Sequence, residues 1–214
     1  MSSRELGDEI SKSRIETLTD GVFAIVMTLL VLEIAVPQLS NSEVAAELTK
    51  ELLELWPVLL SYATSFIILG FFWIAHDDQF HYIKRANRIL LWITIFYLMF
   101  VAFVPFSTSL IGEYRDQQIS VIIYGINISI VGFWEYVLWR YATKDHHLVD
   151  SDLDPTFITR VSKRFLLGPT IYLIAVAISF VSTQVSLVLF IATPLYFLVS
   201  ARKDKSWFWF TKNK

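Results

Sequence analysis

The sequence predicts an all-α integral membrane protein with six transmembrane helices. The 214 residues are 55% hydrophobic and 15% aromatic, with a mean hydropathy of +0.53. This apolar content exceeds that of ordinary globular domains. Six apolar segments are each about 20 residues long, which is the length that a helix needs to cross a bilayer. Basic residues also collect in alternate loops, as they do on the cytoplasmic side of membrane proteins.

The candidate spans differ in how clearly they stand out. The third is the clearest, and Pro105 near its far end is expected to interrupt the helix because proline removes a backbone hydrogen bond. The fourth is the weakest, because Asn127 and Glu135 interrupt its apolar run. The fifth and sixth are joined by a short segment and are expected to form an antiparallel hairpin. The six spans are predicted at residues 15–36, 57–77, 86–111, 118–140, 164–182 and 185–202.

Between the first two spans, the segment NSEVAAELTKELLELW (41–56) mixes leucines with acids. This moderately amphipathic pattern predicts a short surface helix. The tail after the last span contains WFWF (207–210), whose rings favour the membrane interface.

The loop charges predict the orientation of the chain in the membrane. The two tails, the loop after the second span and the loop after the fourth carry all but two of the 18 basic residues; the exceptions are Lys50 and Arg115. Both termini are therefore expected in the cytoplasm. The predicted organisation is a cytoplasmic tail (1–13), a single six-helix transmembrane domain (14–203) and a basic, aromatic cytoplasmic tail (204–214).

Several classes of function are disfavoured by the sequence. The net charge of −2 does not indicate a protein that binds nucleic acid, and the absence of cysteine excludes thiolate chemistry. No phosphate-binding loop or catalytic motif is recognisable, so neither an enzyme nor a cofactor is expected. The cluster in HDDQFH (76–81) contains potential metal ligands, but a solvated helix end is the favoured interpretation. The polar loop around His146 and His147 is likewise expected to be solvated rather than pH-sensing.

A stripe of small and aliphatic residues follows one side of the first predicted helix. Gly21, Ile25, Thr28 and Leu32 recur at helical spacing, and Leu29 lies beside them. Two interpretations remain open at this point. The stripe packs against lipid or protein, or it lines a pore in which aliphatic rings gate by dewetting. In the second case, the Thr28 hydroxyl would offer an oxygen to a cation.

Two acids flank this stripe. Asp20 lies in the first turns of the helix, where the positive end of the helix dipole stabilises a carboxylate. The carboxylate can also pair with a base such as Arg14. A structural role is favoured over ion binding. Glu33 lies at the outer end and would form a ring that concentrates cations at a pore entrance.

The first span also resembles a known family. RIETLTDGVFAIVMTLLVLEI (14–34) resembles the first-helix signature Arg-x-x-x-Phe-Ser-Asp of the transmembrane-protein-175 family of potassium channels. Leucine stands here for phenylalanine and threonine for serine; the four positions are Arg14, Leu18, Thr19 and Asp20. FFWIAHDDQFHYI (71–83) is similar to the family's Trp-x-x-His second helix, and residues 86–114 are similar to its third. These patterns cover about half of the chain.

The resemblance implies a homotetramer in the plasma membrane that conducts potassium in preference to sodium. The first helices would surround a central pore without a carbonyl selectivity filter. By similarity, the aliphatic constriction falls on Ile25, Leu29 and Leu32, with Thr28 as a hydroxyl layer. The signature residues would bind the first helix to its neighbours; these residues are Arg14, Thr19 and Asp20, with Trp73, His76 and Asn87 as partners.

The alternative function is a secondary transporter of a small solute or ion. A transporter is expected to show broken helices, polar groups at mid-membrane depth and two related halves. No internal repeat is recognisable, and polar residues within the spans are sparse. An intramembrane enzyme would need polar residues that converge at depth. A potassium-permeable channel is therefore the predicted function.

Overall fold

The computed structural model describes residues 11–39 and 44–203, which are almost entirely helical. The predicted tail at 204–214, including the WFWF segment, lies outside these residues, as does most of the tail at 1–13. The helices are α1 (Lys12–Leu32), α2 (Val44–Glu54), α3 (Trp56–Tyr82), α4 (Arg88–Ala102), α5 (Val104–Glu113), α6 (Gln118–Thr143), the 3-10 turn η1 (Lys144–His146), α7 (Pro155–Ser179) and α8 (Thr183–Lys203).

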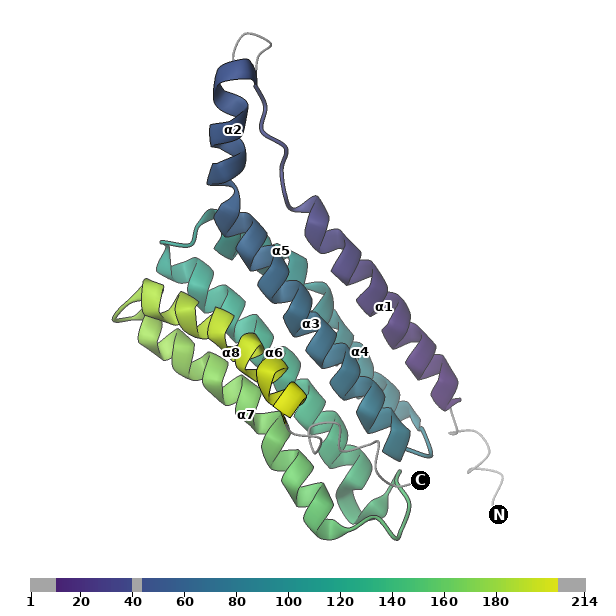
Figure 1. Cartoon of the computed structure of the whole chain (residues 1–214). Coiled ribbons are helices and arrows are strands. Elements are labelled where there is room, and N and C mark those ends of the chain that lie inside the picture. The colour runs from purple at the N-terminus through teal and green to yellow at the C-terminus, as the bar shows by residue number, and fades with distance from the viewer. Residues whose placement is uncertain (1–10, 40–43, 204–214) are drawn as a thin grey trace.

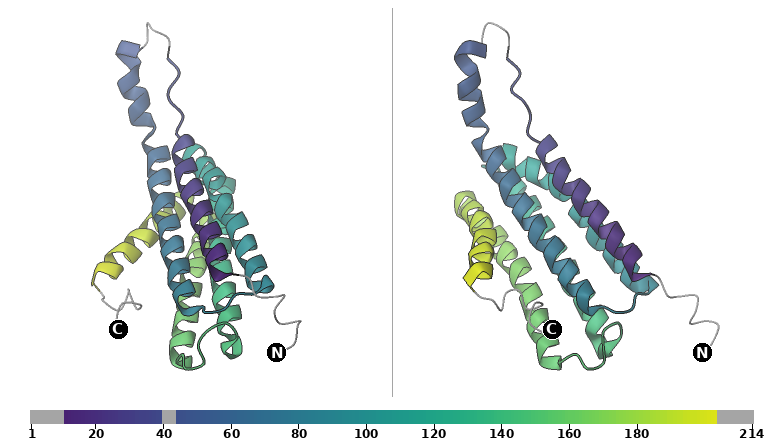
Figure 2. Two further views of the ribbon diagram at one scale, coloured as in Figure 1. Left: turned by 90° about the vertical axis from the view of Figure 1, so that its right-hand side faces the viewer. Right: turned by 45° about the vertical axis from the view of Figure 1, so that its right-hand side comes forward.

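The lengths and composition of these helices are those of an integral membrane protein. Within the described residues, five helical segments are long and apolar enough to cross a bilayer: α1, α3, the α4–α5 pair, α6 and α7. The sixth predicted span corresponds to α8, whose described apolar part, Thr183–Tyr196, is shorter. The predicted surface helix is present as α2, which projects beyond one end of the bundle (Figure 2).

The helices follow one another across the bundle. α1 packs against α3, α4 and α5, whereas α6 packs against α4 and α5 on one side and α7 on the other. α8 packs mainly against α7 and makes smaller contacts with α3 and α6. α1 and the α7–α8 hairpin therefore lie on opposite sides of the molecule (Figure 1).

Proline and capping residues set two boundaries. α4 ends at Ala102 and α5 begins at Val104, with Pro105 in its first turn, so the predicted interruption is confirmed. α7 begins at Pro155, before the apolar span predicted at 164–182. The Asp154 carboxylate caps this helix by accepting a hydrogen bond from the Thr156 amide at 2.8 Å. The first turns of α7 carry charged residues, so hydropathy alone does not predict that they are helical.

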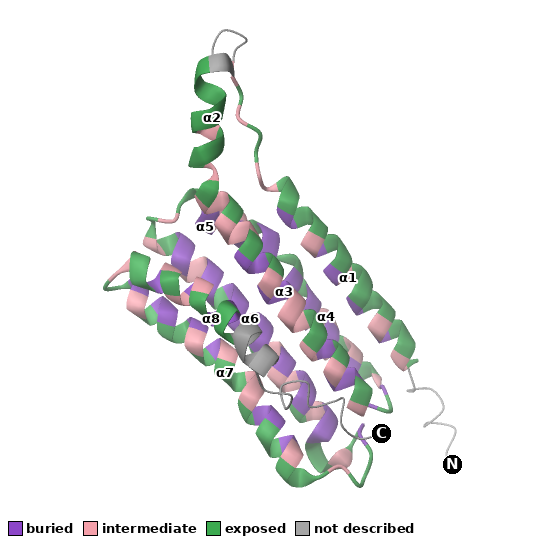
Figure 3. Ribbon diagram, in the orientation of Figure 1, coloured by how far each residue is buried: buried purple, intermediate pink, exposed green. Residues whose placement is uncertain are grey.

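The weakest predicted span, α6, is the most buried of the candidate spans (Figure 3). Its two interrupting residues, Asn127 and Glu135, face the interior and are only 3% and 1% exposed. α6 also approaches α7 closely at Gly132, where an added Cβ would lie 2.6 Å from Pro169. Its polar side chains thus reflect a central position in the bundle, where other helices replace lipid as neighbours.

Candidate pore helix and its supporting network

α1 has one face buried in the bundle and one face left open. The buried face consists of Ile15, Thr19, Phe23, Val26 and Leu30. The open face includes the predicted stripe with Leu18 and is wider than it: its exposed residues include Thr17, Leu18, Gly21, Ala24, Ile25, Thr28, Leu29, Val31 and Leu32. Exposed positions recur along α1 in Figure 3. Ile25 is 60% exposed and Leu32 is 73% exposed, although both are large aliphatic residues. The predicted stripe therefore points away from the rest of its own subunit and is available to lipid, to other subunits or to a pore.

The Thr28 hydroxyl donates its proton to the helix itself. It bonds to the Ile25 carbonyl at 2.7 Å and lies 3.1 Å from the Ala24 carbonyl. A hydroxyl has one proton and two acceptor lone pairs. With its proton directed to the backbone, the exposed oxygen keeps acceptor capacity toward whatever faces α1. Glu33 follows as the C-cap residue of α1, at the end of the open face.

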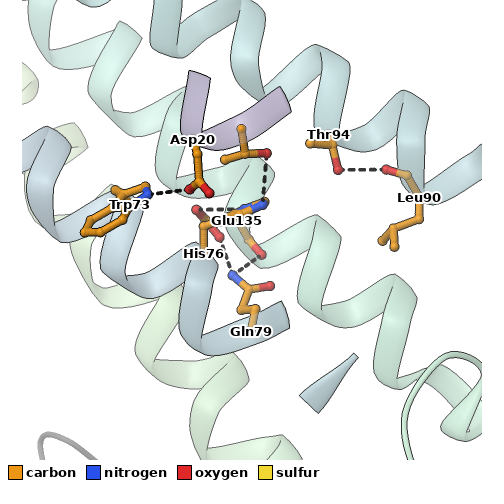
Figure 4. A network of polar contacts seen from close by, with 8 residues as sticks. Asp20, Trp73, His76, Gln79, Leu90, Thr94 and Glu135 are labelled. Carbon is orange, nitrogen blue, oxygen red and sulfur yellow. Dashed lines mark hydrogen bonds and ion pairs between the residues drawn. The ribbon is translucent and has the colours of Figure 1, made fainter. Parts of the chain in front are cut away.

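Two residues of the signature segment bind α1 to α3. The Asp20 carboxylate accepts a hydrogen bond from the Trp73 indole at 2.8 Å (Figure 4). One turn of α3 further on, His76 Nε2 lies 3.3 Å from the Thr19 hydroxyl. The sequence suggested that Asp20 could pair with Arg14. The two residues do not pair, because a separation of six residues places them about 120° apart around the helix. Arg14 and Leu18 are instead exposed on the first turns of α1.

His76 lies at the centre of a buried polar network. Its ring stacks on Tyr97 of α4, with centroids 5.3 Å apart, and on Phe80, with centroids 4.5 Å apart. His76 Nδ1 lies 3.6 Å from the Glu135 carboxylate of α6, which also accepts a hydrogen bond from the Gln79 amide (Figure 4). A buried carboxylate requires such partners, because it has left water. The network thus joins α1, α3, α4 and α6.

Sequence reasoning missed Gln79 and Tyr97 and left Glu135 without a partner. The available signal was weak: an acid in an apolar run implies a partner but does not identify it. Within the described residues, no group of three histidine, cysteine or acidic side chains could hold a metal ion. The cluster predicted at 76–81 divides, since His76 points into the bundle and His81 is exposed.

The hydrogen bonds of Asn87, which was expected in the network that supports α1, go to other parts of the bundle. Its side-chain oxygen caps α4 by accepting from the Leu90 amide, and its amide donates to the Tyr141 hydroxyl at 2.8 Å. His147 lies 3.3 Å from the same amide. The Arg85 guanidinium, in the connection between α3 and α4, donates to the His147 carbonyl at 2.9 Å. Asn87 and Arg85 therefore fix the α3–α4 connection to the end of α6 and to the loop that contains His147.

We expect the Asp20–Trp73 contact to contribute about 1 kcal/mol to the stability of the folded protein, because it is a hydrogen bond between two exposed side chains. Asp20→Ala and Trp73→Phe should each lower the melting temperature in detergent. In the double variant the losses should not add, because both changes remove the same bond. Thermal unfolding of the four proteins measures this coupling; fully additive losses would mean that the bond does not hold α1.

Comparison with known proteins identifies the family. The family model described as endosomal/lysosomal potassium channel TMEM175 matches residues 14–105. A protein of Chamaesiphon minutus named as a potassium channel is 34% identical over 197 residues, which cover 90% of this chain and 96% of that protein. The chain belongs to the TMEM175 family.

Other relatives support the same assignment. A protein of Streptomyces collinus, also named as a potassium channel, is 33% identical over 81% of this chain and 85% of its own length. The crystal structure of a lysosomal potassium-selective channel TMEM175 homolog from Chamaesiphon minutus superposes with a TM-score of 0.77 at 33% identity, covering 89% of this chain and 97% of that chain. TMEM175 proteins are ion channels and not enzymes. The part matched by the family model contains α1 and α3, and therefore both polar contacts between them.

Proposed function

We propose that this TMEM175 protein is a potassium-permeable cation channel, assembled as a homotetramer in which four α1 helices surround the pore. The observation that carries the proposal is the open aliphatic face of α1, on a helix whose opposite face is fixed to α3, α4 and α5. A pore-lining helix must present side chains that its own subunit does not cover. The names of the two bacterial relatives support potassium as the permeant ion.

In the proposed pore, Ile25, Leu29 and Leu32 form hydrophobic rings and Thr28 supplies a layer of oxygens. Aliphatic rings close a narrow pore by excluding water. The chain contains no Thr-Val-Gly-Tyr-Gly segment that would form a carbonyl filter. The Thr28 oxygens, which retain acceptor capacity, would replace part of the hydration shell of a permeating cation. Glu33 would concentrate cations at the outer mouth.

We further propose that the channel lies in the plasma membrane with both termini in the cytoplasm. Lys84 and Arg85 lie beside the loop that follows α6, where the Lys84 amide donates to the Leu148 carbonyl at 2.8 Å. Two basic loops thus meet at one end of the bundle. The opposite end carries Arg115 in the α5–α6 connection. This segregation of positive charge favours a cytoplasmic position for the basic end.

Flux into liposomes tests the function. Purified protein should pass potassium down a gradient faster than sodium down an equal gradient, and both rates should exceed those of empty liposomes. Equal potassium and sodium rates would contradict potassium preference while retaining a cation channel. Flux of neither ion, in protein verified as folded and reconstituted, would favour the transporter alternative.

Thr28→Ala should reduce the preference for potassium over sodium by about threefold, because the substitution removes an oxygen from each subunit at the narrow part of the pore. The measurement is the reversal potential under mixed ions. Thr170→Ala is the matched control, since Thr170 on α7 is also exposed and also donates to a carbonyl of its own helix, that of Leu166 at 2.7 Å. An unchanged reversal potential for Thr28→Ala would remove this residue from selectivity.

A further inference from the structure

A cavity of about 370 Å³ lies on the side of the bundle away from α1. α3, α5, α6 and α8 form its walls, and the α5–α6 connection lies at one end. Its apolar lining consists of Leu60, Ile111, Leu187, Val188, Phe190 and Ile191. A volume of this size falls within the range of small-molecule sites.

Arg115 lies at the mouth of this cavity with one nitrogen buried and unused. Its Nη1 is buried and has no hydrogen-bond partner, although a guanidinium N–H is costly to bury unsatisfied. The guanidinium also lies 5.4 Å from the centroid of the Trp56 ring, which lines the same cavity. Its Nε faces the Asp116 carboxylate at 3.8 Å; the Arg115 side chain as a whole is 41% exposed and that of Asp116 is 74% exposed. The mouth therefore holds a cation with an unused donor.

The cavity is polar at one end and apolar along its length. Trp56, Arg115 and Gln184 lie at helix ends, whereas Phe190 and Ile191 lie about two turns deeper along α8. The Tyr124 hydroxyl in the deep part is already bonded to Ser65 at 2.9 Å. Tryptophan and arginine together are typical of the headgroup level of a membrane. An amphiphile with an anionic head and an aliphatic chain matches both parts.

We propose that this cavity binds a membrane phospholipid with an anionic headgroup. The phosphate pairs with the accessible part of the Arg115 guanidinium, whose side chain is 41% exposed, and an acyl chain lies along the groove between α3 and α8. Charge complementarity selects the anionic lipid over a zwitterionic one, because the only described carboxylate that the guanidinium at the mouth meets is that of Asp116, which is distant and exposed. The site lies on the α8 side of the bundle, opposite α1, so lipid can reach it if α1 faces the pore.

Competition between two lipids tests the site in the full-length protein. Purified protein is equilibrated with equal amounts of phosphatidylglycerol and phosphatidylcholine that have identical acyl chains, and native mass spectrometry measures the lipid bound per subunit. The wild type should prefer phosphatidylglycerol by about tenfold, as expected for one charge-assisted hydrogen bond. Arg115→Gln should remove this preference, and Arg115→Lys should largely keep it.

The chain offers a matched control. Lys50→Gln removes the other basic residue at the same end of the bundle, an exposed lysine paired with Glu54, and should leave the lipid preference unchanged. Leu187→Trp fills the apolar part of the cavity and should reduce the binding of both lipids, which tests the cavity separately from the charge of Arg115.

Three results would overturn the proposal. Equal preference in the wild type and Arg115→Gln would do so, and so would an equal loss of preference in Lys50→Gln. Dissociation of subunits in Leu187→Trp would show that a second copy of the chain occupies the cavity. The readout is bound lipid, so the result does not depend on whether the protein conducts potassium.

Discussion

Replacing Ile25 with asparagine should raise potassium flux by about tenfold and reduce discrimination between monovalent cations. Ile25 is 60% exposed on the open face of α1, and four copies would form an aliphatic ring in the proposed tetramer. A polar amide in that ring would hold water in the constriction and remove the dewetting barrier. Flux assays in liposomes with potassium and then sodium gradients measure both effects.

Val31→Asn is the matched control for this substitution. Val31 is 48% exposed on the same helix but lies about 120° around it from Ile25, so it points away from the stripe. We expect little change in flux from this variant. If Val31→Asn raised flux and Ile25→Asn did not, another face of α1 would line the pore, and the proposed constriction would be wrong.

Replacing Glu135 with alanine should destabilise the protein by about 3 kcal/mol. The side chain is 1% exposed. Its removal would leave the Gln79 amide with only the Glu135 backbone carbonyl, at 3.3 Å, and would take away the carboxylate that lies 3.6 Å from His76 Nδ1. The corresponding fall in melting temperature for a chain of this length is roughly 10 °C. Thermal unfolding of the purified protein in detergent measures it.

Glu135→Gln separates charge from hydrogen bonding, because it keeps an acceptor oxygen in nearly the same volume. It should lose less stability than Glu135→Ala. Glu113→Ala, at the exposed end of α5, removes a carboxylate with no buried partner and should have a negligible effect. A similar melting temperature for Glu135→Ala and the wild type would mean that the network does not support the bundle.

Much of the architecture follows from local sequence. Hydropathy locates the helices, and Pro105 identifies the break between α4 and α5 because proline acts on its own backbone. The faces of α1 follow from a period of 3.6 residues, which separates the stripe containing Ile25 and Leu32 from the buried Phe23 and Val26. These features depend on residues that are near one another in the chain.

Contacts between residues that are far apart in the sequence could not be predicted from local patterns. Glu135 meets His76 and Gln79 across more than 50 positions of sequence, and no pattern within α6 identifies its partners. The start of α7 was missed because a helix that extends beyond the membrane need not be apolar there. Asn87 was assigned to the α1 contact by similarity, but its role as a cap is set by the backbone that follows it.

The position of the polar contacts along α1 has a mechanical consequence. Within the described residues, the side-chain hydrogen bonds from α1 to other helices are those of Thr19 and Asp20, both in its N-terminal half. The C-terminal half is held by Phe23, Val26 and Leu30, whose apolar contacts have no preferred direction. The two hydrogen bonds therefore fix α1 near Thr19 and Asp20, whereas apolar packing alone holds its C-terminal half. A shift of the C-terminal half along these apolar contacts would change the separation of the Leu29 and Leu32 side chains between subunits of the proposed tetramer while both hydrogen bonds stay intact.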